Sequence, residues 1–328
     1  MIALLVTLLL SVLFCGLYLR FARARQILAA PNERSSHTMP TPHGGGLPLL
    51  VSFILGLLIA AWLYGPWNES FVVLAFAALF LMLVGVVDDI RGLPMSLRLA
   101  LYALVGIVVA ALELQGAAIT PGFWHAGLVG LAALIMLWST NLYNFMDGID
   151  GIAAIQAVLA CCGAAWLSWV TGQQESYALF CLLFAAAHLG FLAWNLPPAR
   201  LFMGDAGSLP TGFMLAGLAL LGAVGGQLNA LCWLVMLAFF ITDASWTLVW
   251  RLCTGQPFTQ AHRLHAYQRL SRHWDSHMRV DILLLVINTV WLFPLAALLQ
   301  LYPDHALILV LLAYLPLLSG MAKIHRLA

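Results

Sequence analysis

Two adjacent carboxylates, Asp88 and Asp89, stand at the end of a long apolar run. Neighbouring carboxylates at a membrane boundary repel each other and are costly to desolvate. They persist most easily where a divalent cation or a cationic ligand neutralises them. The alternative is that the pair simply begins a solvated loop, and the pair alone does not decide between the two.

A second polar segment contains Asn144, Asp147 and Asp150, with Gly148 and Gly151 among them. If the segment is helical, a spacing of three places the polar side chains near one another on one side. The glycines would let a backbone or a phosphate approach closely. Oxygen ligands of this kind suit Mg²⁺ or Mn²⁺ and not zinc. A helix cap is the alternative, although a cap needs only one such residue.

Asp205 is the third acidic candidate, and it stands between Gly204 and Gly207 at the start of another apolar run. A carboxylate at a helix N-terminus can cap that helix. It can equally offer a metal ligand beside backbone N–H groups that favour phosphate. Both interpretations stay open at this point.

Two further loops carry candidate binding residues. The run Gly44-Gly45-Gly46 could hold a phosphate, although glycine runs more often mark only a turn. His262, His265 and Arg269 lie in a loop dense in His and Arg. That loop could bind anionic phosphates or a nucleotide, or it could be a juxtamembrane basic loop held by anionic lipid head groups.

The elements that position these residues are apolar. Hydrophobic residues make up 63% of the 328, charged residues only 8%, and the mean hydropathy is +0.97, far outside the range of soluble domains. A net charge of +1 and the lack of a basic tract give no indication of a nucleic-acid partner. Runs long enough to cross a bilayer predict an all-α polytopic membrane protein with eleven spans. They lie near 2–19, 46–65, 70–87, 97–114, 126–143, 152–171, 177–194, 209–225, 228–250, 280–300 and 305–321.

Basic residues set the orientation of these spans. With the N-terminus outside, all 14 Lys and Arg fall in cytoplasmic loops or at the cytoplasmic C-terminus. The connections at 20–45, 88–96, 144–151, 195–208 and 251–279 are then cytoplasmic, and they hold most of the Asp, His and Asn residues. We therefore expect one membrane domain over 1–328 with its site at the cytoplasmic face.

Taken in order, the polar segments resemble those of the polyprenyl-phosphate N-acetylhexosamine-1-phosphate transferases, known as glycosyltransferase family 4. The resemblance covers nearly the whole chain, and its order is more specific than any single motif. The matching segments are Pro31-Asn32, Arg34-Ser35, His37, Pro40-Thr41-Pro42, Gly44-Gly45-Gly46, Asp88-Asp89, Asn144 to Gly151, Gly204 to Ser208, and His262, His265 and Arg269.

This resemblance implies a Mg²⁺-dependent enzyme, with Mn²⁺ as the other candidate ion, at the bacterial inner membrane. It would transfer a sugar 1-phosphate, such as that of GlcNAc, FucNAc or QuiNAc, from a UDP-sugar to undecaprenyl phosphate and release UMP. It implies catalytic roles for Asp88, Asp89 and Asp205, and metal binding by Asp89, Asp147 and Asp205. Substrate binding is implied for Asn32, Arg34, His37, Gly45, Asn144, Asp147, Asp150, His262, His265 and Arg269. A homodimer is compatible with the family.

Two departures from the family pattern refine the expectation. Lipid I synthases carry three consecutive histidines where this chain has His262-Arg263-Leu264-His265, so the chain looks more like the branch that initiates O-antigen. The lysine often found after the Asp pair is absent, and Arg98 is the nearest cation that could take its place. A secondary transporter is the alternative from another class, and it better explains Asp243 inside the ninth predicted span.

Overall fold

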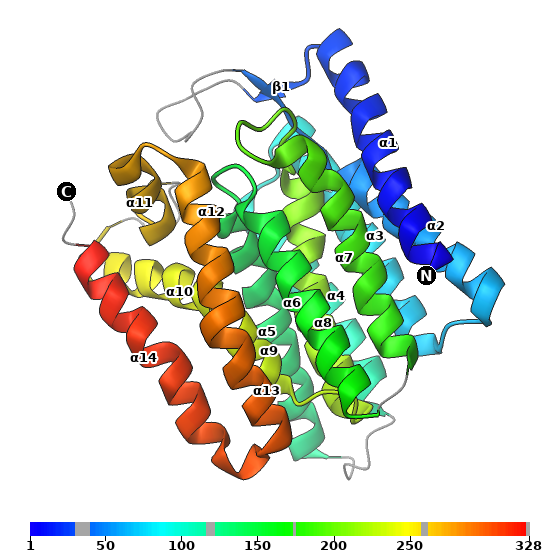
Figure 1. Cartoon of the computed structure of the whole chain (residues 1–328), viewed down its shortest axis with the longest axis vertical. Coiled ribbons are helices and arrows are strands. Elements are labelled where there is room, and N and C mark those ends of the chain that lie inside the picture. The colour runs from blue at the N-terminus through cyan, green and yellow to red at the C-terminus, as the bar shows by residue number, and fades with distance from the viewer. Residues whose placement is uncertain (30–39, 116–121, 173–174, 257–261, 326–328) are drawn as a thin grey trace.

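The computed structural model describes residues 1–29, 40–115, 122–172, 175–256 and 262–325, and nearly all of them are helical (Figure 1). The elements in chain order are α1 (Ile2–Ala24), β1 (Leu28–Ala29), β2 (Thr41–Pro42), α2 (Gly46–Tyr64), α3 (Glu69–Arg91), α4 (Met95–Gln115), α5 (Phe123–Met146), α6 (Ile152–Val170), α7 (Glu175–Asn195), α8 (Asp205–Val224), α9 (Ala230–Met236), α10 (Ala238–Cys253), α11 (Ala266–Trp274), α12 (His277–Val286), the π-helix η1 (Ile287–Leu292), α13 (Phe293–Leu301), the 3₁₀-helix η2 (Pro303–His305) and α14 (Ala306–Ile324). The two short strands pair antiparallel.

Within the described residues, ten helical segments are long and apolar enough to cross a membrane, and the bent pair α9 and α10 makes an eleventh if it is counted as one span. The predicted class, an all-α polytopic membrane protein, is confirmed. The predicted number of spans agrees with the structure when the bent pair is counted once.

Local signals set where α3 begins and ends. The Asn68 side chain caps its first turn by accepting a hydrogen bond from the N–H of Ser70 at 3.1 Å. Gly92 ends the helix in the left-handed conformation with φ 64°, which glycine adopts without steric cost. The acidic pair Asp88 and Asp89 therefore lies on the last turn of α3.

Helix α8 is central to the bundle and contacts α2, α3, α4, α5, α6 and α9. Glycines let its first turn approach two of these helices closely. A Cβ at Gly46 of α2 would overlap the backbone of Gly207, and a Cβ at Gly85 of α3 would overlap the backbone of Asp205. The starts of α2 and α8 and the end of α3 therefore meet backbone to backbone.

The ninth span, predicted as one run over 228–250, is divided into two helices that bend by 72° at Leu237. A buried amide pair stabilises the break. Gln156 Nε2 donates a hydrogen bond to the carbonyl of Met236 at 3.0 Å, and Asn288 Nδ2 donates to Gln156 Oε1 at 3.2 Å. Asn288 belongs to η1, so a π-turn in one span lies opposite the break in another.

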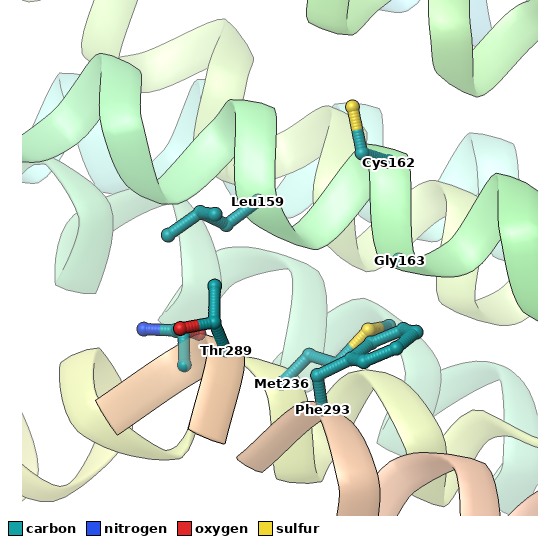
Figure 2. Close-up of a pocket in the computed structure, with 7 residues that line it drawn as sticks. Leu159, Cys162, Gly163, Met236, Thr289 and Phe293 are labelled. Atoms are coloured by element: carbon teal, nitrogen blue, oxygen red, sulfur yellow. The ribbon is translucent and has the colours of Figure 1, made fainter. Parts of the chain in front are cut away.

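A small pocket of about 220 Å³ lies beside this break (Figure 2). Leu159 and Cys162 of α6 line one side, and Met236, Thr289 and Phe293 line the other. The pocket is mostly apolar and lies within the spans, away from the acidic residues. We assign it no role in the chemistry.

Candidate active site

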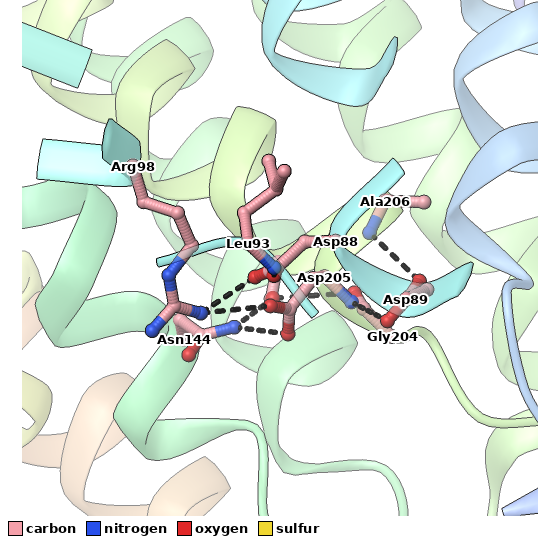
Figure 3. A network of polar contacts seen from close by, with 9 residues as sticks. Asp88, Asp89, Leu93, Arg98, Asn144, Gly204, Asp205 and Ala206 are labelled. Atoms are coloured by element: carbon pink, nitrogen blue, oxygen red, sulfur yellow. Dashed lines mark hydrogen bonds and ion pairs between the residues drawn. The ribbon is translucent and has the colours of Figure 1, made fainter. Parts of the chain in front are cut away.

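The Asp88 side chain joins the end of α3 to the start of α4 (Figure 3). Its Oδ1 accepts a hydrogen bond from the backbone N–H of Leu93 at 2.6 Å, and its Oδ2 pairs with Arg98 Nη1 at 2.5 Å. Charge-assisted contacts of this length offset the cost of burying a carboxylate that is only 9% exposed. Arg98, which we expected to take the place of the missing lysine, therefore contacts the acidic pair.

Asp205, the first residue of α8, contacts side chains from both α4 and α5. Asn144 Nδ2 donates hydrogen bonds to Asp205 Oδ1 at 2.7 Å and to Ser208 Oγ at 2.9 Å. The other oxygen of Asp205 lies 3.6 Å from Arg98 Nη1. One guanidinium thus lies between the carboxylates of Asp88 and Asp205, and residues distant in sequence share one network (Figure 3).

Asp89 contacts the N-terminus of α8. Its two oxygens accept hydrogen bonds from the backbone N–H groups of Asp205 and Ala206, each at 3.3 Å. The partial positive charge of a helix N-terminus stabilises a carboxylate in this position. Gly204 is required here because its φ is 71° and a Cβ would lie only 2.9 Å from Asp89 Oδ2.

The segment Asn144 to Gly151 is helical only over its first three residues. The helix ends at Met146 with Asp147 as its C-cap, so it does not continue to Asp150 as the spacing of three assumed. Asp150 Oδ2 accepts a hydrogen bond from the N–H of Ala199 at 3.0 Å and lies 3.3 Å from His277 Nδ1. Asp150 therefore ties this loop to the α7–α8 connection and to α12, and its contact with a substrate stays a prediction.

Asp147 lies close to the acidic network. Burial raises the pKa of its carboxyl to about 7, and the negative charges of Asp205, Asp89 and Asp150 contribute in the same direction. Four carboxylates are therefore close enough to influence one another at this end of the bundle.

The chemistry of the donor set fits Mg²⁺ or Mn²⁺, since the clustered ligands are carboxylate and amide oxygens. Within the described residues, however, no three His, Cys, Asp or Glu side chains are already arranged to hold a metal ion. The oxygens of Asp89 and Asp205 are instead directed to backbone N–H groups, Asn144 and Arg98. Metal binding by Asp89, Asp147 and Asp205 would require these side chains to exchange partners.

The structure describes the connection between α1 and α2 only in part. Asn32, Arg34 and His37 lie outside the described residues. Gly45 donates its N–H to the carbonyl of Phe202 at 2.9 Å, and a Cβ there would lie 2.6 Å from the ring of Phe191. Gly45 thus serves close packing, and its predicted contact with a substrate is untested.

The basic loop is ordered around α11. The rings of His262 and His265 are stacked with centroids 4.9 Å apart, and Arg269 Nε donates to the carbonyl of Leu264 at 3.1 Å. Burial lowers the pKa of His262 to about 3, and the nearby His265 and Arg251 contribute to the same shift. His262 is therefore neutral at physiological pH and can accept or donate a hydrogen bond.

Asp243 of α10 was left without a role by the sequence. Its carboxylate accepts hydrogen bonds from the N–H groups of Ala266 and Tyr267, each at 2.9 Å, and the Tyr267 hydroxyl donates to the carbonyl of Phe145 at 2.9 Å. These contacts dock α11 onto α10 and the end of α5. The sequence signal was an ionisable residue in an apolar run, which demands a partner without indicating where it lies.

An apolar cavity of about 630 Å³ lies between α5, α8, α9 and α10. Leu142 and Tyr143 of α5 line it, with Leu215 of α8 and Trp233 of α9. Asn144, the next residue of α5, belongs to the acidic network. The cavity and the network are therefore neighbours along one helix.

Fold and site together define an all-α, multi-pass membrane protein with a carboxylate-rich site at one end of its helices, beside an apolar cavity. The chain belongs to glycosyl transferase family 4, whose sequence model matches residues 71–223.

Among the proteins to which this chain is similar are three from bacteria. The chain is 33% identical over 201 residues to the phospho-N-acetylmuramoyl-pentapeptide-transferase of Prochlorococcus marinus, an alignment that covers 55% of this chain and about half, 54%, of that protein. It is 30% identical over 237 residues to the protein of that name in Geobacillus thermodenitrificans, which covers 67% of this chain and 73% of the relative. It is 27% identical over 286 residues to the undecaprenyl-phosphate alpha-N-acetylglucosaminyl 1-phosphate transferase of Thermotoga maritima, with 83% of each chain covered.

Proposed function

We propose that this protein transfers an N-acetylhexosamine 1-phosphate from a UDP-sugar to undecaprenyl phosphate and releases UMP. The observation that carries the proposal is that the acidic network and the apolar cavity involve neighbouring residues of α5. Asn144 belongs to the network, and Tyr143 lines the cavity. Such an arrangement suits a substrate with a phosphate at one end and a hydrocarbon chain at the other. The Thermotoga maritima relative, which aligns over most of both chains, is named for this kind of transfer.

The acceptor lipid would lie with its isoprenoid chain in the cavity and its phosphate at the end of α5. Aromatic and aliphatic side chains such as Trp138, Leu215, Trp233 and Ile241 line the cavity. These side chains favour a hydrocarbon occupant because burial of apolar surface is the main term in its binding. The remainder of a long polyprenyl chain would stay in the bilayer.

The chemistry does not need a strong general base. A phosphate monoester has a second pKa of about 6, so the acceptor is mostly dianionic at neutral pH. One of its oxygens attacks the β-phosphorus of the UDP-sugar, and the bond from that phosphorus to the bridging oxygen breaks as UMP leaves. Both oxygens of Asp88 are already bonded, to Leu93 and to Arg98, so we assign Asp88 the role of holding Arg98 at the site.

The difficulty of the reaction is that two anions must meet. We propose that Asp89, Asp147 and Asp205 hold Mg²⁺ or Mn²⁺, whose charge when bound would offset the repulsion between the phosphates and favour UMP as a leaving group. Arg98 would contribute further positive charge. Asn144 would hold Asp205 in place through the hydrogen bond at 2.7 Å.

We assign the UDP-sugar to the basic loop. Arg269 can pair with a diphosphate, and the neutral His262 can hydrogen-bond a phosphate or a sugar hydroxyl. The loop does not carry three consecutive histidines, so we propose GlcNAc, FucNAc or QuiNAc as the sugar and initiation of a surface glycan such as O-antigen as the purpose. The inner membrane, an outside N-terminus, a cytoplasmic site and a homodimer are parts of the same proposal.

The test is a transfer assay with purified protein in nanodiscs, undecaprenyl phosphate, Mg²⁺ and a panel of UDP-sugars. The panel comprises the three N-acetylhexosamine donors and UDP-MurNAc-pentapeptide, and mass spectrometry identifies the lipid product. We expect an undecaprenyl-diphosphate sugar from one N-acetylhexosamine donor, and UMP in equal amount. Uptake of a solute into vesicles without any lipid-linked product would favour the transporter instead.

A further inference from the structure

The Asp243 carboxylate is fully buried in α10 and accepts four hydrogen bonds. Oδ1 accepts from the N–H of Ala266 at 2.9 Å, from His265 Nδ1 at 3.2 Å and from the Thr247 hydroxyl at 3.2 Å. Oδ2 accepts from the N–H of Tyr267 at 2.9 Å. This set of donors explains how an ionisable group is retained within an apolar span, without any role in an ion pathway.

Asp243 acts as the cap of a helix that lies elsewhere in the sequence. Helix α11 follows His265, whose own side chain does not cap it. Ala266 and Tyr267 carry the first N–H groups of that helix, and both donate to Asp243. A carboxylate is also stabilised by the dipole of the helix it caps. Because capping is supplied from α10, the His265 side chain is left for another contact.

The contact with Asp243 also decides which nitrogen of His265 carries a proton. An ionised carboxylate has no proton to donate, so Nδ1 acts as the donor to Oδ1. In the neutral ring Nε2 is then the nitrogen without a proton. The ring is stacked against His262 and lies at 30° to Phe145, with centroids 6.3 Å apart. Phe145 follows Asn144, so the ring is held next to the acidic network.

We propose that Asp243 is a positioning residue for the transfer: it fixes the Nδ1–H tautomer and the ring plane of His265 and holds α11 against the end of α5. Its effect on turnover rests on the function proposed above. Its effect on the imidazole does not.

The imidazole is tested by ¹⁵N NMR of histidine-labelled protein in nanodiscs, with His265→Gln used to assign the signal. We expect a single Nδ1–H tautomer in the unaltered protein. Asp243→Asn should give a mixture of tautomers, because an amide can donate as well as accept. The matched control is Thr242→Val, since Thr242 is the preceding buried residue and its hydroxyl has no hydrogen-bond partner in the described part of the chain. Thr242→Val should keep the single tautomer.

The kinetic test is a double-mutant cycle. Loss of a group that orients a metal-bound imidazole costs about 10–100-fold, and we expect Asp243→Asn to lower kcat/KM for the UDP-sugar by a similar factor. The KM for undecaprenyl phosphate should not change. In the variant that also carries His265→Ala, Asp243→Asn should add little, because both changes remove the same arrangement. Additive losses would mean that Asp243 acts independently of His265, and would overturn the proposal.

Asp243→Glu keeps a carboxylate and is expected to retain the Nδ1–H signal with a smaller loss of kcat/KM. It replaces Asp243→Asn in both experiments if the latter is not monodisperse. An unchanged tautomer in Asp243→Asn, or loss of the Nδ1–H signal in a folded Asp243→Glu, would overturn the proposal. If the NMR result is as expected but no UDP-sugar yields a lipid product, the proposed function fails and the positioning of His265 stands.

Discussion

At the scale of single residues, one guanidinium serves two carboxylates. Arg98 pairs with Asp88 and reaches Asp205, while Asp89 depends on the N-terminus of α8. The balance of charge at the site is therefore negative before any phosphate binds. Each carboxylate that is removed should change how well the site attracts a cation.

Asp205→Asn should lower kcat by about 10²-fold or more, because it removes charge at the point where a cation and the phosphates would meet. The exchange keeps the shape of the side chain, and the protein should remain folded. Asp304→Asn is the matched control, since Asp304 is an exposed residue of η2 remote in the structure from this network. Full activity of Asp205→Asn, or of the unaltered protein in excess chelator, would contradict the metal assignment.

His262 should make the folded protein sensitive to acid. Its pKa is lowered from 6.5 to about 3 by burial, so between these values the unfolded chain binds a proton that the folded chain does not. Stability from this group is present above pH 6.5 and is lost as the pH falls toward 3. We expect a smaller drop in melting temperature between pH 7.5 and pH 5 in His262→Gln than in the unaltered protein.

The control for that measurement is His273→Gln, because His273 is an exposed histidine of the neighbouring helix α11. Its substitution should leave the acid sensitivity as it was. Equal drops in the unaltered protein and in His262→Gln would show that His262 is not held neutral.

The sequence predicted which residue types gather at the site but not how each is used. Asp88, Asp205 and Asn144 lie together, as their segments suggested. Asp150 and Gly45 have structural partners that no spacing could reveal, because Ala199 and Phe202 come from a different connection. Hydrogen bonds between distant segments depend on the tertiary arrangement.

At the scale of elements, α11 packs against the end of α5 through the hydrogen bond from the Tyr267 hydroxyl to the carbonyl of Phe145. Arg269→Ala should raise the KM for the UDP-sugar by about tenfold and leave kcat largely intact, because a contact made equally to substrate and transition state affects binding alone. His265→Ala should raise KM and lower kcat. Initial rates with each substrate varied in turn measure both effects, and a changed KM for undecaprenyl phosphate alone would place the lipid acceptor here instead.

The contact between α3 and α8 tolerates no side chain at Gly85. Gly85→Val should lower the melting temperature, since overpacking costs about 1–3 kcal/mol, and should abolish most activity by moving Asp88 away from Asp205. Gly130→Ala is the control, because nothing lies within 4 Å of the added methyl group. Thermal unfolding and transfer rates would be compared, and equal effects of the two changes would contradict the packing argument.

The break at Leu237 shows what hydropathy does not predict. Hydropathy predicts one span for an apolar run whether the helix is straight or bent. Position 237 carries neither Pro nor Gly, which would have indicated a break. The break is stabilised by Gln156, some 80 residues earlier in the sequence. Its Nε2 donates a hydrogen bond to the Met236 carbonyl. The two ends of α3, by contrast, can be predicted from the sequence, because Asn68 is a typical N-cap and Gly92 a typical C-cap.

At the scale of the whole molecule, the spans were predictable because burial in lipid demands long apolar helices. The packing of the spans against one another could not be predicted, because hydropathy does not tell which apolar surfaces fit together. The central place of α8 depends on glycine contacts with α2 and α3 that the hydropathy pattern does not distinguish.

The proposed orientation can be tested at an existing cysteine. Cys253 is exposed at the end of α10, so a membrane-impermeant maleimide should label it only in inverted vesicles. The other exposed cysteine, Cys162, would first be replaced by serine. Tyr302→Cys, at an exposed residue of the opposite face, should be labelled from the outside. Labelling of Cys253 in right-side-out vesicles would reverse the topology.

The glycine contacts of α8 have a consequence for biosynthesis. The ribosome delivers α3 and its acidic end well before α8, and at about 5–20 residues per second the stretch from Arg91 to Asp205 takes on the order of 10 s to make. During that interval the start of α8 is not yet present to pack against Gly85. Asp89 also lacks the N-terminal turn of α8 that it contacts in the finished protein. In nascent chains that stall before residue 205 the contacts of Asp89 and Gly85 with α8 are therefore missing, and the acidic network can form only after α8 has been made.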